Sequence, residues 1–240
     1  MARLLGCIKG VVPRDTKVST VLGASVKRIA VFIHQPKCSV QSANGIINAL
    51  SPHYKFKIFT RHEVERDFFD DVDAVCFPGG LGDSESWHYL TNENKSAIKR
   101  FVRGGGKYLG ICMGAYWADP NYFDLLDNIR AEQYITRPGA DTRRPHAKNQ
   151  RVLWRGEEER MFFYDGCALL GSGIDRSKIW SLYPNGDAMA LIQGNIGLIG
   201  CHPESEAHWY NEYSWMQGKY HRGLHHKLLL DFVNELFSQQ

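Results

Sequence analysis

The sequence lacks the marks of a membrane or secreted protein. No apolar run approaches the about 18 consecutive residues that a membrane-spanning helix needs. The six cysteines include no close pair of the Cys-x-x-Cys type, and in a chain of 240 residues they do not resemble a disulfide scaffold. Cys76 and Cys201 lie in apolar runs, where a free thiol behaves as a small hydrophobic group. We therefore expect a cytoplasmic protein with reduced cysteines.

The chain also lacks an excess of either charge. It has 29 Lys and Arg against 26 Asp and Glu, a formal net charge of +3. Nothing in this balance suggests the basic patch that nucleic-acid binding needs, so we expect neither nucleic acid nor a membrane as a partner. "LLGC" at Cys7 imitates a lipoprotein cleavage box, but too few residues precede it for a signal peptide.

What the sequence does contain is ample core material, with 43% hydrophobic and 12% aromatic residues. Residues 1–26 show no clear periodicity and are expected to form a leader that is surface-lying or partly disordered, followed by one domain over residues 27–240. Apolar runs typical of buried strands occur in the first half, and segments with helical spacing or composition separate them. The expected strands are 28–34, 54–60 (near an edge), 73–80 and 107–112, and the expected helices are 39–51, 61–70 and 91–106, the last capped by Thr91.

Alternating strands and helices predict parallel pairing with helices on both faces. The second half is different: β-rich pieces separated by turns predict hairpins, and the last segment predicts an amphipathic helix. These pieces are 150–155, 159–171, 178–184 and 188–206, with the helix at 225–240. The expected fold class is therefore α/β: a three-layer sandwich with a mostly parallel, flavodoxin-like central sheet and an antiparallel extension in the C-terminal half.

The first candidate for chemistry is "GICMG", where a strand leads directly into a helix through Cys112. Small residues two before and two after a side chain allow the sharp turn of a nucleophile elbow. A thiol at a helix N-terminus is also favoured as the thiolate. The alternative is that Cys112 only fills space between strand and helix, so a partner base has to decide.

"GLIGCHPESE" supplies that partner, because an apolar run ends in His202 and an acid follows at Glu204. A cysteine, a histidine base and an acid that orients it form the triad of acyl transfer. "PGG" could bring backbone N–H groups close to a developing oxyanion, together with the N–H of Met113. Taken alone, "PGG" is equally well explained as an ordinary turn.

"FPGG", "GICMG" and "HPE", in this order, resemble the class I glutamine amidotransferase superfamily over about residues 28–236. Within it, "GGGKYLGICMGAYWA" and "FYDGCALLG" look most like the N-terminal domain family of biotin-protein ligases. The resemblance implies a flavodoxin-like amidotransferase fold and a site of known layout. It assigns Cys112 as nucleophile, His202 as base, Glu204 as orienting acid, and Gly79, Gly80 and Met113 as oxyanion donors.

Three departures limit what is carried over. Glutamine-using members usually have Gln at the position of Tyr116, so the resemblance does not carry glutamine over as substrate. The peptidase branch usually places His directly after the nucleophile, where this chain has Met113. A GRGRxG-like biotin loop is missing, so biotin ligation is not implied. Substrate-pocket candidates are Tyr116, Ser84 and Glu85, the latter two in a segment that could equally be a solvated loop.

The sequence thus predicts an amidotransferase-like thiol hydrolase that cleaves an amide through an acyl-enzyme at Cys112. The alternatives are a non-catalytic or regulatory binding module of the same fold and a cysteine peptidase. We expect a small-molecule amide or a peptide as substrate and leave room for a separate partner enzyme. We expect no cofactor and no metal, since His221 and His225 in "HRGLHHK" have helical spacing but no acid or cysteine completes a site.

Overall fold

The computed structural model describes residues 25–33, 39–64, 67–80, 87 and 94–239. Most of the predicted leader, the Thr91 cap and the pocket candidates Ser84 and Glu85 lie outside these residues. The elements of the first half follow the predicted alternation. They are β1 (Arg28–Phe32), α1 (Val40–Leu50), β2 (Lys55–Phe59), β3 (Ala74–Phe77), α3 (Lys95–Arg103), β4 (Lys107–Ile111) and α4 (Met113–Tyr116).

The second half forms more strands than the sequence indicated. Its elements are β5 (Arg130–Gln133), η2 (Tyr134–Thr136), β6 (Lys148–Trp154), β7 (Glu157–Phe163), β8 (Cys167–Leu170), η3 (Arg176–Lys178), β9 (Ile179–Leu182), β10 (Ala188–Gln193), β11 (Ile196–Ile199), α5 (Ala207–Asn211), η4 (Ser214–Met216) and α6 (Leu224–Ser238). The β-rich segment 159–171 forms two strands, β7 and β8, because the chain turns at Asp165, which has a positive φ.

Within the described residues, one eleven-stranded sheet joins both halves. Its main path is β2-β1-β3-β4-β11-β10-β9-β6-β7, with β8 paired to β10 and β5. The pairs from β2 to β11 are parallel and the remaining pairs are antiparallel. The predicted α/β class, with a parallel region and an antiparallel extension, is confirmed. As predicted, β2 lies at an edge.

Strand β11 has a position that the sequence did not indicate. It forms an antiparallel hairpin with β10, yet it also pairs in parallel with β4, Ile196 opposite Tyr108 and Ile199 opposite Ile111. Two strands that run the same way end at the same edge of a sheet. The segments that follow β4 and β11 therefore begin side by side, although about 90 residues separate them in the sequence.

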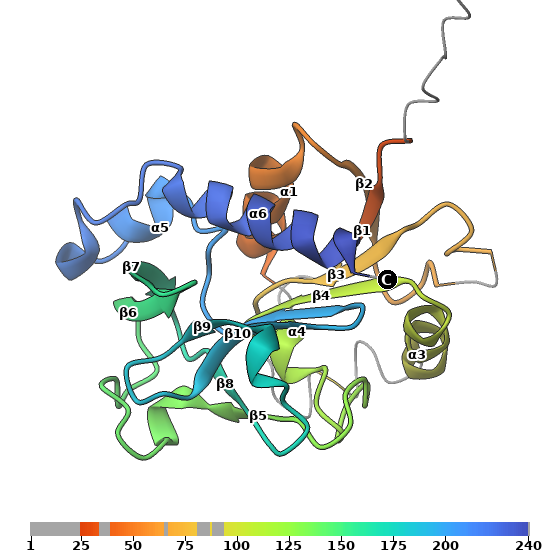
Figure 1. Cartoon of the computed structure of the whole chain (residues 1–240). Helices are drawn as coiled ribbons and strands as arrows, with labels where there is room; N and C mark the ends of the chain where they lie inside the picture. The colour runs from red at the N-terminus through yellow and green to blue at the C-terminus, as the bar shows by residue number, and fades with distance from the viewer. Residues whose placement is uncertain (1–24, 34–38, 65–66, 81–86, 88–93, 240) are drawn as a thin grey trace, which may run out of the picture.

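The central strands alternate between two cores, one on each face of the sheet. Ile29 and Val31 face one core with residues of α1 and α6, and Ala30 and Phe32 face the other with residues of α3 and α4. Figure 1 shows α1 and α6 together over one face, with α3 on the opposite side. Such two-sided burial explains why β1, β3 and β4 read as continuous apolar runs.

Two local predictions need correction or addition. The charged segment 61–70 was predicted as a helix, but its described residues 61–64 and 67–70 form turns. Their backbone is held by side chains instead: Glu63 accepts a hydrogen bond from the N–H of Thr60 at 2.6 Å. Strand β5 and helix α5 were not predicted.

Among the described helices, none combines the length and apolar character needed to cross a membrane.

Candidate functional site

Cys112 lies at a sharp turn between β4 and α4. Its φ is 50° and its ψ is −103°, a conformation that costs free energy for a residue with a side chain. The two glycines of "GICMG" are sterically required. A Cβ at Gly110 would lie 2.5 Å from the carbonyl oxygen of Gly114, and one at Gly114 would lie 2.0 Å from that of Phe77. The local geometry is that of the predicted elbow, and it leaves Cys112 6% exposed.

His202 reaches the same sheet edge because it follows β11. The Cys112 N–H donates to the Ile199 carbonyl at 2.8 Å, which joins the two strand ends, and the His202 N–H donates to the Phe162 carbonyl at 2.8 Å. The imidazole packs edge-on against Phe162 and Trp209. It is 5% exposed, so its orientation is fixed by packing on several sides.

Glu204 is fully buried and holds the imidazole from behind. Its Oε1 lies 2.8 Å from His202 Nδ1 and also accepts a hydrogen bond of 2.6 Å from Ser42 Oγ. The close approach of α1 depends on a glycine, because a Cβ at Gly45 would lie 2.4 Å from the Glu204 carbonyl oxygen. Helix α1 thus supplies both the hydroxyl and the space that the acid needs.

Gly79 has a different role from the one predicted. Its N–H donates to Ser42 Oγ at 2.9 Å, so it is not directed at an oxyanion. A Cβ at Gly79 would lie 2.6 Å from His202 Cε1, and the missing side chain is therefore what admits the imidazole. Gly80 and Met113 remain the candidate oxyanion donors, and both line the cavity beside Cys112.

The charge of His202 follows from its partners. Burial lowers the pKa of this imidazole, but the Glu204 carboxylate and the sulfur of Cys112, including hydrogen bonds to both, outweigh it and raise the pKa to about 10. His202 is therefore an imidazolium at neutral pH. An imidazolium beside a cysteine is the setting in which proteins stabilise thiolates.

Two cavities meet at Cys112. One has a volume of about 530 Å³ and is lined by Tyr116, Tyr164 and Asp165, among others, and a smaller one of about 180 Å³ extends past His202. The Tyr116 hydroxyl donates to the Asp165 carbonyl at 3.1 Å, and the carbonyl of Tyr164 lies 3.8 Å from Cys112 Sγ. Tyr116 thus lines the cavity as predicted, while its hydroxyl braces the turn after β7.

Sequence reasoning missed two members of this site. Ser42 joins Gly79 to Glu204, and Tyr164 lines both cavities. A serine in the first turn of the helix, on the face that also carries Ala43 and Ile46, was the available signal for Ser42. The described residues contain no group of three or more His, Cys, Asp or Glu side chains that could hold a metal ion.

Comparison with known proteins identifies the fold. Residues 34–125 match the family model described as "Biotin-protein ligase, N terminal". Among solved structures, the chain is similar to PurLQS from Thermotoga maritima, with a TM-score of 0.61, 15% identity, and 88% of this chain and 99% of the other covered. The fold is that of the class I glutamine amidotransferases. A glutamine amidotransferase from Thermotoga maritima also matches, with a TM-score of 0.55, 14% identity and coverage of 88% and 92%.

These matches confirm the resemblance to the amidotransferase-like superfamily and to the biotin-protein ligase N-terminal family. A search of curated proteins finds no match to this chain. At such low identity the structural likeness describes the fold, so the chemistry has to be argued from the site itself.

Proposed function

We propose that the protein is an amidotransferase-like thiol hydrolase that cleaves an amide bond through an acyl-enzyme at Cys112. The observation that carries the proposal is the position of the His202 imidazole, which is buried, lies 2.8 Å from Glu204 and follows the strand that pairs with the strand leading to Cys112. Acyl transfer needs a nucleophile, a proton carrier and a group that orients the carrier, and these three residues have the matching chemistry.

The charge state of His202 defines its part in each step. In the first step, the Cys112 thiolate attacks the amide carbonyl, and the N–H groups of Gly80 and Met113 stabilise the oxyanion. His202 then gives its proton to the leaving nitrogen, the C–N bond breaks, and ammonia or an amine departs. The neutral imidazole next takes a proton from water, the hydroxide attacks the thioester, and the carboxylic acid leaves as the thiolate returns.

The substrate is a small amide or a peptide that fits the 530 Å³ cavity. The volume of this cavity lies within the range common for small-molecule sites. Tyr116 stands where glutamine-using enzymes usually have Gln, so the assays have to include amides other than glutamine. A separate partner enzyme that accepts the released ammonia is compatible with this proposal.

The experiment follows alkylation of Cys112 by iodoacetamide as a function of pH. Peptide mapping by mass spectrometry is needed because Cys76, Cys167 and Cys201 are also free thiols. We expect Cys112 to react at neutral pH faster than these buried thiols, and His202→Asn and Glu204→Gln to slow it. Ammonia release from glutamine, asparagine and simple amides, and cleavage of peptide anilides, are measured in parallel, with Cys112→Ser as the control.

An inert Cys112 whose reactivity is the same in His202→Asn would refute the proposal and leave the binding module as the better explanation. A reactive Cys112 with cleavage of peptide anilides but no ammonia release would identify a peptidase. Ammonia release that disappears in Cys112→Ser would identify the amide class directly.

A further inference from the structure

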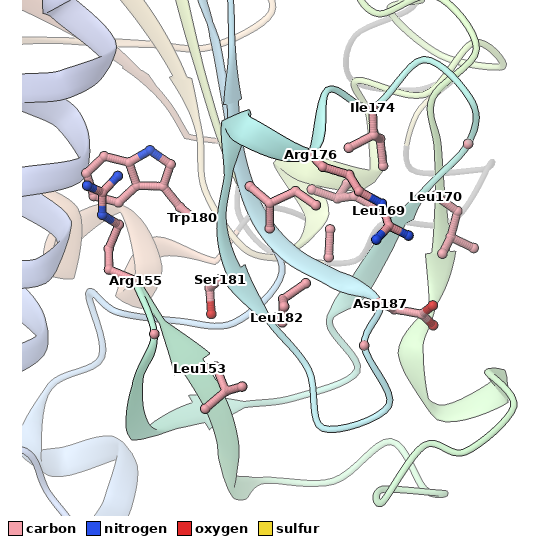
Figure 2. Close-up of a pocket in the computed structure, with 15 residues that line it drawn as sticks. Leu153, Arg155, Leu169, Leu170, Ile174, Arg176, Trp180, Ser181, Leu182 and Asp187 are labelled. Carbon is pink, nitrogen blue, oxygen red and sulfur yellow. The ribbon is translucent and has the colours of Figure 1, made fainter.

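A separate cavity lies on the antiparallel part of the sheet. It has a volume of about 690 Å³ and is lined by residues of β6, β8, η3, β9 and β10 and of the turns beside them. Its lining shares no residue with the two cavities at Cys112. Figure 2 shows its side chains on the strand faces and at the turns that connect them. The amide chemistry proposed above does not use this cavity.

The lining is mostly apolar. The aliphatic side chains are those of Leu153, Leu169, Leu170, Ile174, Ile179, Leu182 and Ala188. Leu153, the last residue but one of β6, is 41% exposed. A hydrocarbon chain that fills a hollow of this kind removes apolar surface from water, which favours binding.

Two arginines with unused charge accompany this apolar surface. Neither Arg155 nor Arg176 forms an ion pair within the described residues. Arg155 stacks on Trp180, 4.6 Å from the ring centroid, and so forms a wall of the cavity. In Figure 2, the Arg176 guanidinium lies among Leu169, Leu170 and Asp187 instead. Arg176 is thus the cation best placed to meet a ligand.

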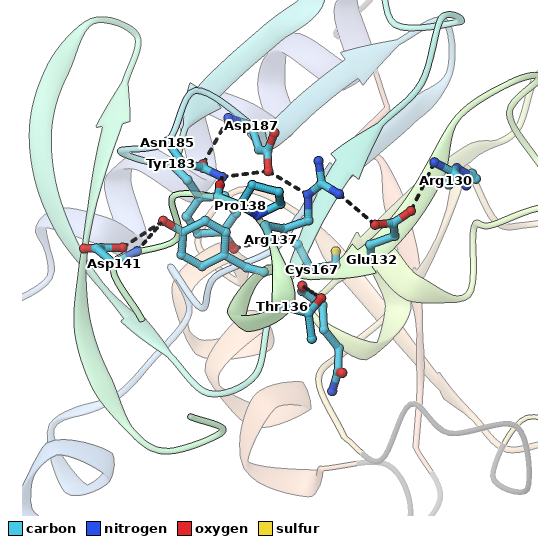
Figure 3. A network of polar contacts seen from close by, with 12 residues as sticks. Arg130, Glu132, Thr136, Arg137, Pro138, Asp141, Cys167, Tyr183, Asn185 and Asp187 are labelled. Atoms are coloured by element: carbon cyan, nitrogen blue, oxygen red, sulfur yellow. Dashed lines mark hydrogen bonds and ion pairs between the residues drawn. The ribbon is translucent and has the colours of Figure 1, made fainter. Parts of the chain in front are cut away.

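The neighbouring carboxylate is already occupied. Asp187 accepts hydrogen bonds from Arg137 Nε at 2.9 Å and from Asn185 at 2.8 Å, and Arg137 also bonds Glu132, in the network that Figure 3 shows. The Asp187 carboxylate is therefore already paired with the Arg137 guanidinium. Arg176 has no such ion pair among the described residues.

A polar group also lies at the cavity floor. Ser181 is 1% exposed, and its Oγ has no hydrogen-bond partner in the described part of the chain. A buried hydroxyl left in this state costs free energy. The floor of this cavity thus carries an unsatisfied polar group beside its apolar side chains, and polar groups of this kind can orient a ligand.

We propose that this cavity binds an amphipathic carboxylate. The hydrocarbon chain lies on the leucines of β8 and β9, and the carboxylate pairs with the Arg176 guanidinium, whose planar fork suits two parallel hydrogen bonds. The apolar surface supplies most of the affinity. Arg176 makes the site prefer an anion over a neutral or cationic ligand. Because no step involves Cys112, this site stands or falls independently of the proposed hydrolase activity.

The test is isothermal titration of the full chain with decanoate, decan-1-ol and decylamine. We expect decanoate to bind one site per chain, and the alcohol and amine to bind about tenfold more weakly, because they lack the charge-assisted bond. Arg176→Ala should reduce decanoate binding to the level of decan-1-ol and leave decan-1-ol binding unchanged. Leu153→Glu adds a negative charge, the same sign as that of decanoate, at an exposed position of the lining. This variant should also bind decanoate more weakly than the wild type does.

Arg151→Ala is the matched control, since Arg151 is an exposed arginine of the same strand β6 that does not line the cavity. It should bind decanoate as the wild type does. Absence of a saturable decanoate site would overturn the proposal. So would equal decanoate affinity in wild type and Arg176→Ala, because the apolar surface alone would then explain the binding.

Discussion

At the scale of single residues, the tightest constraint on the site is the contact between Gly79 and His202. In Gly79→Ala, the new methyl would lie 2.6 Å from His202 Cε1, so the imidazole has to move away from Cys112. A shift of this kind can reduce a rate by about 10²-fold, and we expect a loss of that order in iodoacetamide alkylation of Cys112. Gly104→Ala is the control, because its φ of −78° is accessible to alanine and it lies at the end of α3. Equal rates in both variants would contradict the steric role.

Ser42 is one of the two site residues that sequence reasoning missed, and its contribution is measurable as stability. Ser42→Ala removes the hydroxyl that accepts from the Gly79 N–H and donates to the buried Glu204. The loss of a hydrogen bond to a buried charge, with a backbone N–H left unpaired, predicts a decrease of about 1–3 kcal/mol in the free energy of unfolding. Urea denaturation measures it, with Ser238→Ala on the surface of α6 as the control. An unchanged unfolding midpoint would show that another group replaces Ser42.

At the scale of elements, the sequence predicted what is local and missed what is not. Strands β1, β3 and β4 were recognisable because burial on both faces produces continuous apolar runs. The parallel pairing of β11 with β4 was not recognisable, since the hairpin with β10 explains the same residues equally well. Yet that pairing is what places His202 beside Cys112. The motif order indicated the site, but only the sheet topology explains it.

The N-terminal end of α6 and the loop before it anchor the turn that carries the triad. His221 Nδ1 accepts the N–H groups of Gly223 and His225, so its Nε2 carries the proton and donates to the Ser205 carbonyl at 2.9 Å. Nε2 of His226 lies 3.1 Å from the same oxygen. His221 and His226, two histidines of the "HRGLHHK" segment, thus hold Ser205, the residue after Glu204, in place.

This anchoring predicts an effect of α6 on the site. In the double variant His221→Ala and His226→Ala, the Ser205 carbonyl loses both partners, and we expect faster amide hydrogen exchange over residues 202–206. Cys112 alkylation should slow with it, because Glu204 and His202 belong to that turn. Lys227→Ala, an exposed position of the same helix, serves as the control. Unchanged exchange over 202–206 would show that packing alone holds the turn.

At the scale of the whole molecule, the two parts of the sheet have separate tasks. The parallel part brings the ends of β4 and β11 together and so builds the cysteine site. The antiparallel part carries the 690 Å³ cavity that we assign to an amphipathic carboxylate. The sequence predicted both parts as structure, but only the first as a site, because no short motif marks a cavity formed by side chains from five elements.

The buried histidines also make the stability of the whole fold depend on pH in two opposite ways. Burial lowers the pKa of His221 to about 4 and that of His225 to about 3, whereas Glu204 and Cys112 overcome the effect of burial at His202 and raise its pKa to about 10. In the unfolded chain, all three imidazoles have a pKa of about 6.5. Folding therefore favours neutral His221 and His225 but protonated His202.

The two kinds of pKa shift have opposite signs, so they change the free energy of unfolding in different pH ranges. The contribution of His202 is fully present below about pH 6.5 and is lost as pH rises through about 10, whereas that of His221 is present above about 6.5 and is lost as pH falls through about 4. Urea denaturation from pH 5 to 9.5 tests both. The stability difference between wild type and His202→Gln should shrink toward pH 9.5, and that between wild type and His221→Gln toward pH 5. A pH-independent difference for His202→Gln would mean that folding does not raise the pKa of this imidazole, and the thiolate–imidazolium pair on which the proposed hydrolysis begins would then be wrong.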